Sequence, residues 1–524
     1  MKKLFAPVLC LCLCLLASAP ALAGGLTVWA IESTMVTDYQ ENGQSQWMEE
    51  QTGVPITWVS TPRNGWYQAF QASVMANEEI DIYLYDFDTS EAAMLGTDMG
   101  YIIPLEDYIT PENTPNIYAL LEADPGLRER ITAPDGHIYT LFSNGVYDLG
   151  AFKQKLWVNR YFLEAYTAET GLGMPGTTEA FEAMLLYFKT HDMNGDGVLN
   201  EVPYIGCSGV EGTYTLYGAF LPANSGNGFG CTLDENGGLV FAYTQEAYKE
   251  ALGYVRGLYA QGLVSPDTFT TDPSARYALT SGPRGTVRAG VVTGVNASDV
   301  VQLSNEEDAM TYADYIAIPP LAGPDGLRST VTAGEAVTSL RNAITIHCDD
   351  PAAAMRWLDA GYSEAARLYA VYGGVQGVDW DYAEGETLNG PGEVVVSLHD
   401  VGENATWNGQ GIVYRVTEED YLHMDASQLG FSDALCTYRA NLAYRPYAVQ
   451  NPWPIVVWPG EYTDEAAEYS ELNSLISSAV SAYATDVILG RKDLEGDWQA
   501  YLDGLGAMGL ARYLELTQLY ITIG

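Results

Sequence analysis

Beyond its first residues, the chain alternates short apolar runs with amphipathic stretches. Runs of five or six mostly apolar residues, bounded by turn-forming residues, predict strands, and the stretches between them have the spacing of helices. The predicted strands are residues 26–31, 56–60 and 81–85, and the predicted helices are residues 44–51 and 66–76. Strands that alternate with helices predict an α/β fold with a largely parallel sheet.

The same pattern continues further along the chain. We expect a helix over 90–99, a strand over 138–142 and, after a connection, a strand over 156–159. Two helices follow, one from Tyr161 to near Gly171 and one over 177–189 that Thr177 caps. In open α/β sheets, ligands bind beyond the carboxyl ends of the strands, which makes residues 85–88 a candidate cleft rim.

The segment 192–203, DMNGDGVLNEVP, predicts a calcium loop. Asp192, Asn194 and Asp196 stand at alternate positions, so a tight turn can direct three oxygen ligands at one hard cation. Gly197 allows the sharp bend, and Val198 offers its carbonyl. An EF-hand would have glutamate at the twelfth position, where this chain has a proline, so the loop is EF-like. The alternative is a surface turn without metal.

The N-terminus has the features of a signal peptide. Lys2 and Lys3 precede an apolar run, and small residues lead to an expected cleavage site after Ala23, so residues 1–23 are predicted to be removed. The run contains three cysteines, each preceded by leucine rather than by the small residue of a lipoprotein signal. No later run reaches the ~18 apolar residues of a spanning helix, so we expect a soluble, secreted protein without a lipid anchor.

The composition narrows the choice of partners and chemistry. The net charge of −44 disfavours nucleic acid and anionic lipid as partners. The 37 tyrosines and 11 tryptophans suit stacking on sugar rings as well as packing. Cys207 and Cys231 allow a local disulfide or two buried thiols, and both alternatives stay open.

Sequence motifs for catalysis are missing. The five histidines are scattered, and the sequence contains neither GxSxG nor GxxxxGK[ST]. With 68 carboxylates, a pair flanking a glycosidic bond is the enzyme alternative, but no pair stands out. A calcium-stabilised interaction module would require repeats, and the chain shows none. We therefore expect a binding protein rather than an enzyme.

An ordered series of short motifs resembles family 1 of the extracellular solute-binding proteins of ABC importers, which includes alginate-binding proteins and Gram-positive lipoproteins. The series covers almost the whole chain after the signal peptide. It includes LWVN at 156–159, the loop at 192–203, IPPL at 318–321, PAAAMRWLD at 351–359 and DW at 497–498. The resemblance implies a periplasmic-binding-protein-like (type II) fold with two α/β lobes that close on a ligand.

The family plan also implies the lobes and the partners. One lobe would comprise residues 24–143 and 330–395, and the other residues 144–329 and 396–524. The chain would then be a monomeric receptor at the outer face of the cytoplasmic membrane that delivers an oligosaccharide to an ABC transporter permease. Peptide is the alternative ligand, and a secreted glycoside-acting enzyme is the alternative function.

The resemblance assigns calcium a structural role away from the ligand. The implied metal ligands are Asp192, Asn194, Asp196, the Val198 carbonyl, Asn200 and Glu201. Asn200 departs from the aspartate of many relatives, which removes one charge and lowers the expected affinity. The missing lipidation cysteine and Gln376, where relatives often have glutamate, are further departures.

Five residues are the candidate ligand contacts. Tyr85 and Asp86 follow a predicted strand, Tyr147 lies at the first crossing, Trp380 matches a family tryptophan, and Trp407 lies in a polar loop. Ordinary packing or exposure is the alternative for each of them. Trp66 and Trp157 are assigned to the core instead, because they lie in a predicted helix and a predicted strand.

Overall fold

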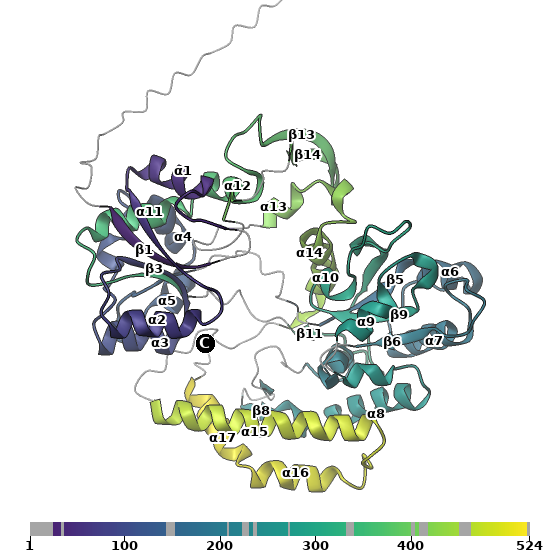
Figure 1. Cartoon of the computed structure of the whole chain (residues 1–524). Helices are drawn as coiled ribbons and strands as arrows, with labels where there is room; N and C mark the ends of the chain where they lie inside the picture. The colour runs from purple at the N-terminus through teal and green to yellow at the C-terminus, as the bar shows by residue number, and fades with distance from the viewer. Residues whose placement is uncertain are drawn as a thin grey trace, which may run out of the picture.

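The structure is a computed structural model of the chain. It describes residues 25–32, 36–142, 152, 154–206, 209–222, 230–233, 238–270, 273–331, 340–399, 404–407, 418–449 and 463–520. These residues form two α/β lobes with a β-hairpin above them (Figure 1). The expected α/β fold with two lobes is confirmed.

The first lobe is built on a mixed sheet with the strand order β2-β1-β3-β12-β4. β1 (Leu26–Ile31) pairs in parallel with β2 (Ile56–Thr61) and β3 (Ile82–Phe87). β12 (Leu340–Ile344) runs antiparallel between β3 and β4 (Leu141–Phe142). The helices of this lobe are α1 (Gly43–Thr52), α2 (Trp66–Met75), α3 (Thr89–Ala93), α4 (Pro115–Ala123), α5 (Pro125–Ile131), α11 (Pro351–Ala360) and α12 (Glu364–Tyr372).

Local sequence signals explain several of these boundaries. Asn42 caps α1 by accepting hydrogen bonds from Gln44 N and Ser45 N, and Gly53, with a φ of 67°, ends the helix in the left-handed region. The buried residues of the strands and of α11 join in one core. The first predicted βαβ units are therefore present at the expected positions.

The second lobe contains a sheet with the order β10-β5-β9-β6. β5 (Lys155–Asn159) pairs antiparallel with β10 (Tyr315–Ile318) and β9 (Ala289–Gly294), and β6 (Val202–Ile205) runs parallel to β9. Thr177 caps α7 by accepting from Ala180 N, as predicted. The main helices are α6 (Arg160–Thr170), α7 (Thr178–Thr190), α8 (Glu246–Ala260), α14 (Asp433–Tyr444), α15 (Thr463–Ile488), α16 (Trp498–Ala507) and α17 (Leu510–Tyr520).

One edge of each sheet lies where the chain passes between the lobes, and we call it the crossing edge. In the first lobe the carboxyl ends of β3 and β4 and the start of β12 lie there, because β12 begins opposite Phe87 and Phe142. In the second lobe Lys155 at the start of β5 pairs with Gly294 at the end of β9. Between the lobes, β11 (Thr330–Val331) pairs with β15 (Ala448–Val449) (Figure 1).

Two further pieces complete the chain path. The hairpin of β13 (Trp380–Thr387) and β14 (Gly390–Ser397) lies above the lobes (Figure 1). Residues 404–407 return to the first lobe, where Asn404 O accepts from Gly43 N (3.2 Å) and Trp407 joins the first core. This contact differs from the expectation that residues 396–524 belong to the second lobe, and the reason is the set of hydrogen bonds to the start of α1.

Candidate functional site

On the first lobe, an ion pair marks the crossing edge. Asp86, near the carboxyl end of β3, pairs with Arg341, the second residue of β12. The Asp86 side chain is 55% exposed, yet desolvation raises its pKa and outweighs the opposing effect of Arg341. An accessible carboxylate at this edge can accept hydrogen bonds from a polar ligand group.

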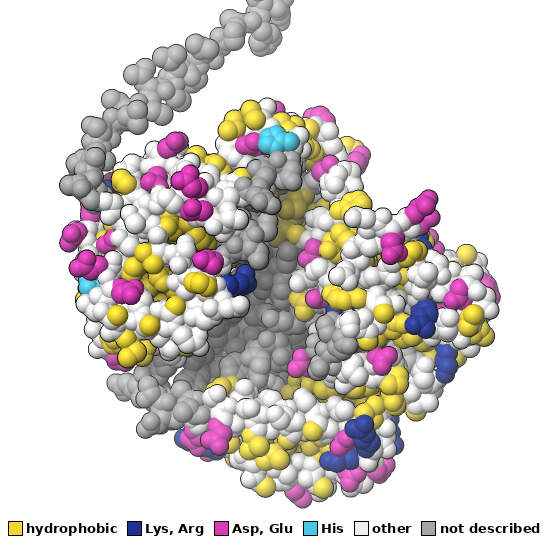
Figure 2. Space-filling view, in the orientation of Figure 1, with side chains coloured by type: hydrophobic (Ala, Val, Ile, Leu, Met, Phe, Trp, Pro, Cys, Tyr) yellow, Lys and Arg dark blue, Asp and Glu magenta, His cyan; other side chains and the backbone are white. Residues whose placement is uncertain are grey.

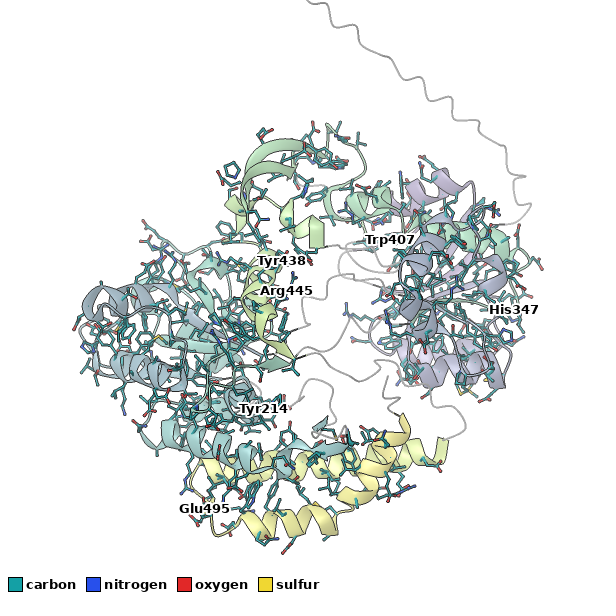
Figure 3. The ribbon with its side chains drawn as sticks, turned by 180° about the vertical axis from the view of Figure 1, so that it is seen from behind. Tyr214, His347, Trp407, Tyr438, Arg445 and Glu495 are labelled. Carbon is teal, nitrogen blue, oxygen red and sulfur yellow. The ribbon has the colours of Figure 1, made fainter. Side chains whose placement is uncertain are left out.

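On the second lobe, a similar pair lies on the side that faces the first lobe. Arg445, which begins the 3-10 turn η10 (Arg445–Tyr447), pairs with Glu418 of α13 (Glu418–Leu422), with Nη2 and Oε1 2.6 Å apart. Tyr438 on α14 donates to the same Oε1 (2.8 Å). Burial would raise the pKa of Glu418, but the bonds from Arg445 and Tyr438 lower it. Figure 3 shows Tyr438 and Arg445 on this side.

Two more basic side chains at this edge are held by the protein itself. The Arg328 guanidinium lies 3.9 Å from the centre of the Tyr447 ring and donates to Pro320 O. Lys155 is fully buried, and its Nζ donates to Phe152 O (2.8 Å) and Val295 O. The space-filling view shows the molecule hollowed between the two lobes (Figure 2).

The structure places the predicted ligand contacts in different settings. Tyr85 and Asp86 adjoin on β3, and Tyr85 is 7% exposed, stacks on Phe70 and donates to Glu91 Oε2 (2.8 Å). Trp380 begins β13, away from β3, and its Nε1 donates to Gly373 O (3.1 Å). Tyr147 lies outside the described residues. Tyr85 and Asp86 are consecutive on β3, so their side chains point to opposite faces of the sheet, and the described members of this set do not converge on one site.

Trp407 is packed into the first core rather than exposed in a polar loop. Its side chain is 1% exposed, its Nε1 donates to Ser45 Oγ (2.8 Å), and its N donates to Gln44 Oε1 (2.9 Å). The ring contacts Trp58 and Trp357, with centroids 5.8 and 6.2 Å away. This placement argues against ligand contact, because protein atoms already surround the ring.

Sequence reasoning missed the arginines of the crossing edge. The chain has only 24 Lys and Arg, yet Arg328 and Arg341 flank the second crossing and Arg445 lies just before β15. Arginine is rare in this chain, so its presence beside the crossings could have indicated a functional role. Recognising it would have required knowing that β12 pairs with β3 and β15 with β11.

The segment 192–203 folds as a tight polar turn. Asp192 Oδ1 accepts from Gly195 N (2.8 Å), and Asp192 Oδ2 accepts from Gly197 N (2.8 Å). Both glycines have positive φ, 77° and 84°. Glu201 Oε1 accepts from Met193 N (2.8 Å), which ties the end of the loop to its start. The alternating side chains therefore turn inward, as a cation loop requires.

The donor set of this loop fits a cation that takes neutral oxygens as well as carboxylates. Among the described residues, no three His, Cys, Asp or Glu side chains are arranged to hold a metal by themselves. Asn200 Oδ1, however, is buried in the loop without a hydrogen-bond partner, which an ion would satisfy. The hydrogen bond from Val198 N is the main cause that lowers the pKa of Asp196 and keeps it charged.

Two further sequence expectations concern cysteines and membrane spans. Cys207 lies outside the described residues, so its pairing with Cys231 stays a prediction. Cys231 itself is buried. Within the described part of the chain, every helix is too short or too polar to traverse a lipid bilayer.

Comparison with known proteins gives matches of two kinds. A model of the family described as bacterial extracellular solute-binding protein matches residues 33–368. The fructooligosaccharide ABC transporter substrate-binding protein FusA of Streptococcus pneumoniae is 27% identical over 326 residues, which are 61% of this chain and 57% of FusA. Lipoprotein LipO of Bacillus subtilis is 25% identical over 305 residues, which are 55% of this chain and 54% of LipO. The chain thus matches little more than half the length of these relatives.

Solved structures of low sequence identity share the fold over nearly the whole chain. FusA from S. pneumoniae in complex with kestose has a TM-score of 0.68 at 21% identity, covering 95% of this chain and 98% of that chain. An EF-hand mutant of FusA in complex with fructo-nystose gives the same values. An extracellular solute-binding protein from Bifidobacterium longum subsp. infantis has a TM-score of 0.72 at 20% identity, covering 94% and 97%.

Proposed function

The chain belongs to the bacterial extracellular solute-binding proteins, and we propose that it is the exported substrate-binding receptor of an ABC importer. Its ligand is an oligosaccharide, captured between the lobes and delivered to membrane permease subunits. The observation that carries this proposal is an accessible carboxylate paired with a guanidinium on each lobe beside the crossings, Asp86 with the largely buried Arg341 and Glu418 with the half-exposed Arg445. Carboxylate and guanidinium groups match the hydroxyl groups of a sugar.

Such a receptor works by differential affinity for two conformations. A ligand that contacts both lobes binds the closed state better and shifts the population toward it. The first lobe comprises residues 24–143 and 330–395, and the second comprises residues 144–329 and 396–524, except that residues 404–407 dock on the first. The relatedness to FusA, whose name refers to fructooligosaccharide, favours sugar over peptide.

A secreted glycoside-acting enzyme is the alternative function. Its support is Asp86, whose raised pKa is a property of a general acid. Against it, Asp86 is paired with Arg341, whose charge favours the ionised carboxylate over the protonated form that a general acid requires. The binding role requires no such proton transfer and accounts for both pairs.

Calcium and export complete the proposal. Asp192, Asn194, Asp196, Val198 through its carbonyl, Asn200 and Glu201 would hold a structural Ca²⁺, and the orphaned Asn200 Oδ1 supports this assignment. The ion would neutralise charge and stiffen the loop without contacting the ligand. Cleavage after Ala23 would release a monomeric chain that acts at the outer face of the cytoplasmic membrane.

A combined binding and turnover experiment tests the proposal. Thermal-shift and calorimetric titrations with oligosaccharide and peptide panels would be followed by chromatography of each recovered ligand. We expect an oligosaccharide to raise the melting temperature, to lower the radius of gyration in X-ray scattering and to be recovered intact. Cleavage of the ligand would favour the enzyme, and a response to peptides alone would overturn the oligosaccharide assignment.

A further inference from the structure

We propose that the two crossing edges select uncharged oligosaccharides and reject acidic glycans, through the ion pairs Asp86–Arg341 and Glu418–Arg445. The inference rests on the proposed receptor function and adds the charge class of its ligand and the residues that set it. One pair lies on each lobe, next to the crossings. A ligand held between the lobes would therefore meet a carboxylate and a guanidinium on both sides.

Each ion pair leaves some of its hydrogen-bond donors and acceptors available to a ligand. A guanidinium has five N–H donors and a carboxylate about four acceptor sites, so a single ion-pair contact leaves groups of both kinds. The side chains of Glu418 and Arg445 are 41% and 44% exposed, and Asp86 is also accessible. Adjacent sugar hydroxyls, which both donate and accept, match this arrangement without adding charge.

Four of the described basic groups at this edge are already occupied by protein atoms. Arg341 and Arg445 have carboxylate partners, Arg328 lies on the Tyr447 ring, and Lys155 donates to two carbonyls. A uronate would have to displace Asp86 or Glu418 or lie beside one of them, within a protein of net charge −44. Like charges placed together in an interface strongly disfavour binding.

Residues that follow the parallel strands do not change this balance. Glu32 follows β1, Arg63 follows β2 and Asp88 follows β3, and all three residues are exposed. The described part of this edge therefore mixes both signs of charge, in contrast to the basic surface that a polyanion requires. The binding of an uncharged ligand is not weakened by charge repulsion at such an edge.

Calorimetry with size-matched ligands tests the inference. The probes are kestose and maltotriose as neutral sugars and tri-galacturonate as the acidic one, titrated into the purified protein at low and high salt. We expect a neutral sugar to bind at least about a hundredfold more tightly than the uronate, because a like charge near Asp86 or Glu418 repels it. Uronate binding should strengthen as salt is added, since salt screens repulsion, while neutral binding should stay unchanged.

Isosteric variants test the residues. Asp86→Asn and Glu418→Gln should each weaken the neutral sugar about tenfold, and together they should improve uronate binding, because each leaves a guanidinium without its carboxylate. The matched control is Glu468→Gln, which removes the charge of the carboxylate that accepts from Arg512 Nη2 between α15 and α17. This control should leave both affinities unchanged, and the melting temperature of each variant checks its folding.

The outcomes separate the inference from the receptor function. Tight uronate binding that weakens with salt would overturn the inference and leave the receptor function in place. Equal affinities in the control and in both site variants would overturn the assignment to these two pairs. If neither kind of sugar bound, the oligosaccharide receptor would be refuted, and the inference with it.

Discussion

Truncation of Trp407 tests how residues 404–407 are held on the first lobe. The indole is 1% exposed and contacts the rings of Tyr39, Trp58 and Trp357. Loss of a fully buried tryptophan side chain costs about 3–5 kcal/mol in the free energy of unfolding. The ring is the apolar anchor of the segment 404–407, which is otherwise held by hydrogen bonds of Asn404 and Asn42 and by bonds to the start of α1, so we expect Trp407→Ala to undock it.

Hydrogen exchange reads out the undocking directly. Gly43 N donates to Asn404 O (3.2 Å), and Thr37 N donates to Asn404 Oδ1 (3.1 Å). A loss of about 3 kcal/mol corresponds to an increase of about a hundredfold in the exchange rate of these amides. Gln44 N is a poor reporter, because Asn42 Oδ1 also accepts from it (3.0 Å).

Two variants serve as references for this measurement. Trp407→Phe keeps an aromatic ring but loses the bond to Ser45 Oγ, so it should show a smaller effect, of about 1 kcal/mol from that bond. Trp498→Ala, in the core of the second lobe, should leave the exchange of Thr37 and Gly43 unchanged. Unaltered exchange at these two amides in Trp407→Ala would refute the docking argument.

Three other predictions concern pH, backbone contacts and metal. Burial would raise the pKa of Asp314, but hydrogen bonds from Thr311, Arg160 and Tyr161 lower it in the folded protein. The ionised Asp314 therefore stabilises the fold fully above the ordinary pKa of about 3.9, and this stabilisation is lost as the pH falls through the lower pKa of the folded state. Urea midpoints of Asp314→Asn should therefore depend less on pH in this acidic range than those of the wild type. Gly171→Ala should lower the free energy of unfolding, measured with urea, by about 1–2 kcal/mol, because alanine is strained at the φ of 73°. Gly323→Ala should lower it by more, because the added Cβ would lie 1.8 Å from Ala219 O. Equal losses in the two variants would contradict this reasoning. Finally, EDTA should lower the melting temperature and Ca²⁺ should restore it, whereas Asp192→Ala should respond to neither.

Local patterns predicted the first lobe well where the determinants are close in sequence. α1 lies between Asn42 and Gly53, both of which act within a few residues. The predicted strand over 138–142 is shorter, because Ile138 O accepts from Leu105 N and Ile138 N donates to Glu106 Oε2 instead of pairing with β12. These partners are distant in sequence, so the pattern does not contain them.

The predicted helix over 90–99 divides into α3 and a π-helical turn, η1 (Met94–Asp98). The Tyr139 ring occupies the space where a Cβ on Gly96 would lie, 2.5 Å away, and this tertiary contact is not encoded in local propensity. The candidate site shows the same division. Asp86 was predicted from the end of a strand, whereas Arg341 required the β3–β12 pairing.

The position of β12 has a consequence for the order in which the chain can fold. β12 supplies the strand between β3 and β4, but it follows them in the chain by the whole sheet of the second lobe. Until residue 344 has been synthesised, β3 and β4 each present an unpaired edge, which is prone to pairing with other chains. The lobe that begins the protein therefore cannot be completed during early synthesis, a delay that would suit the export that we propose.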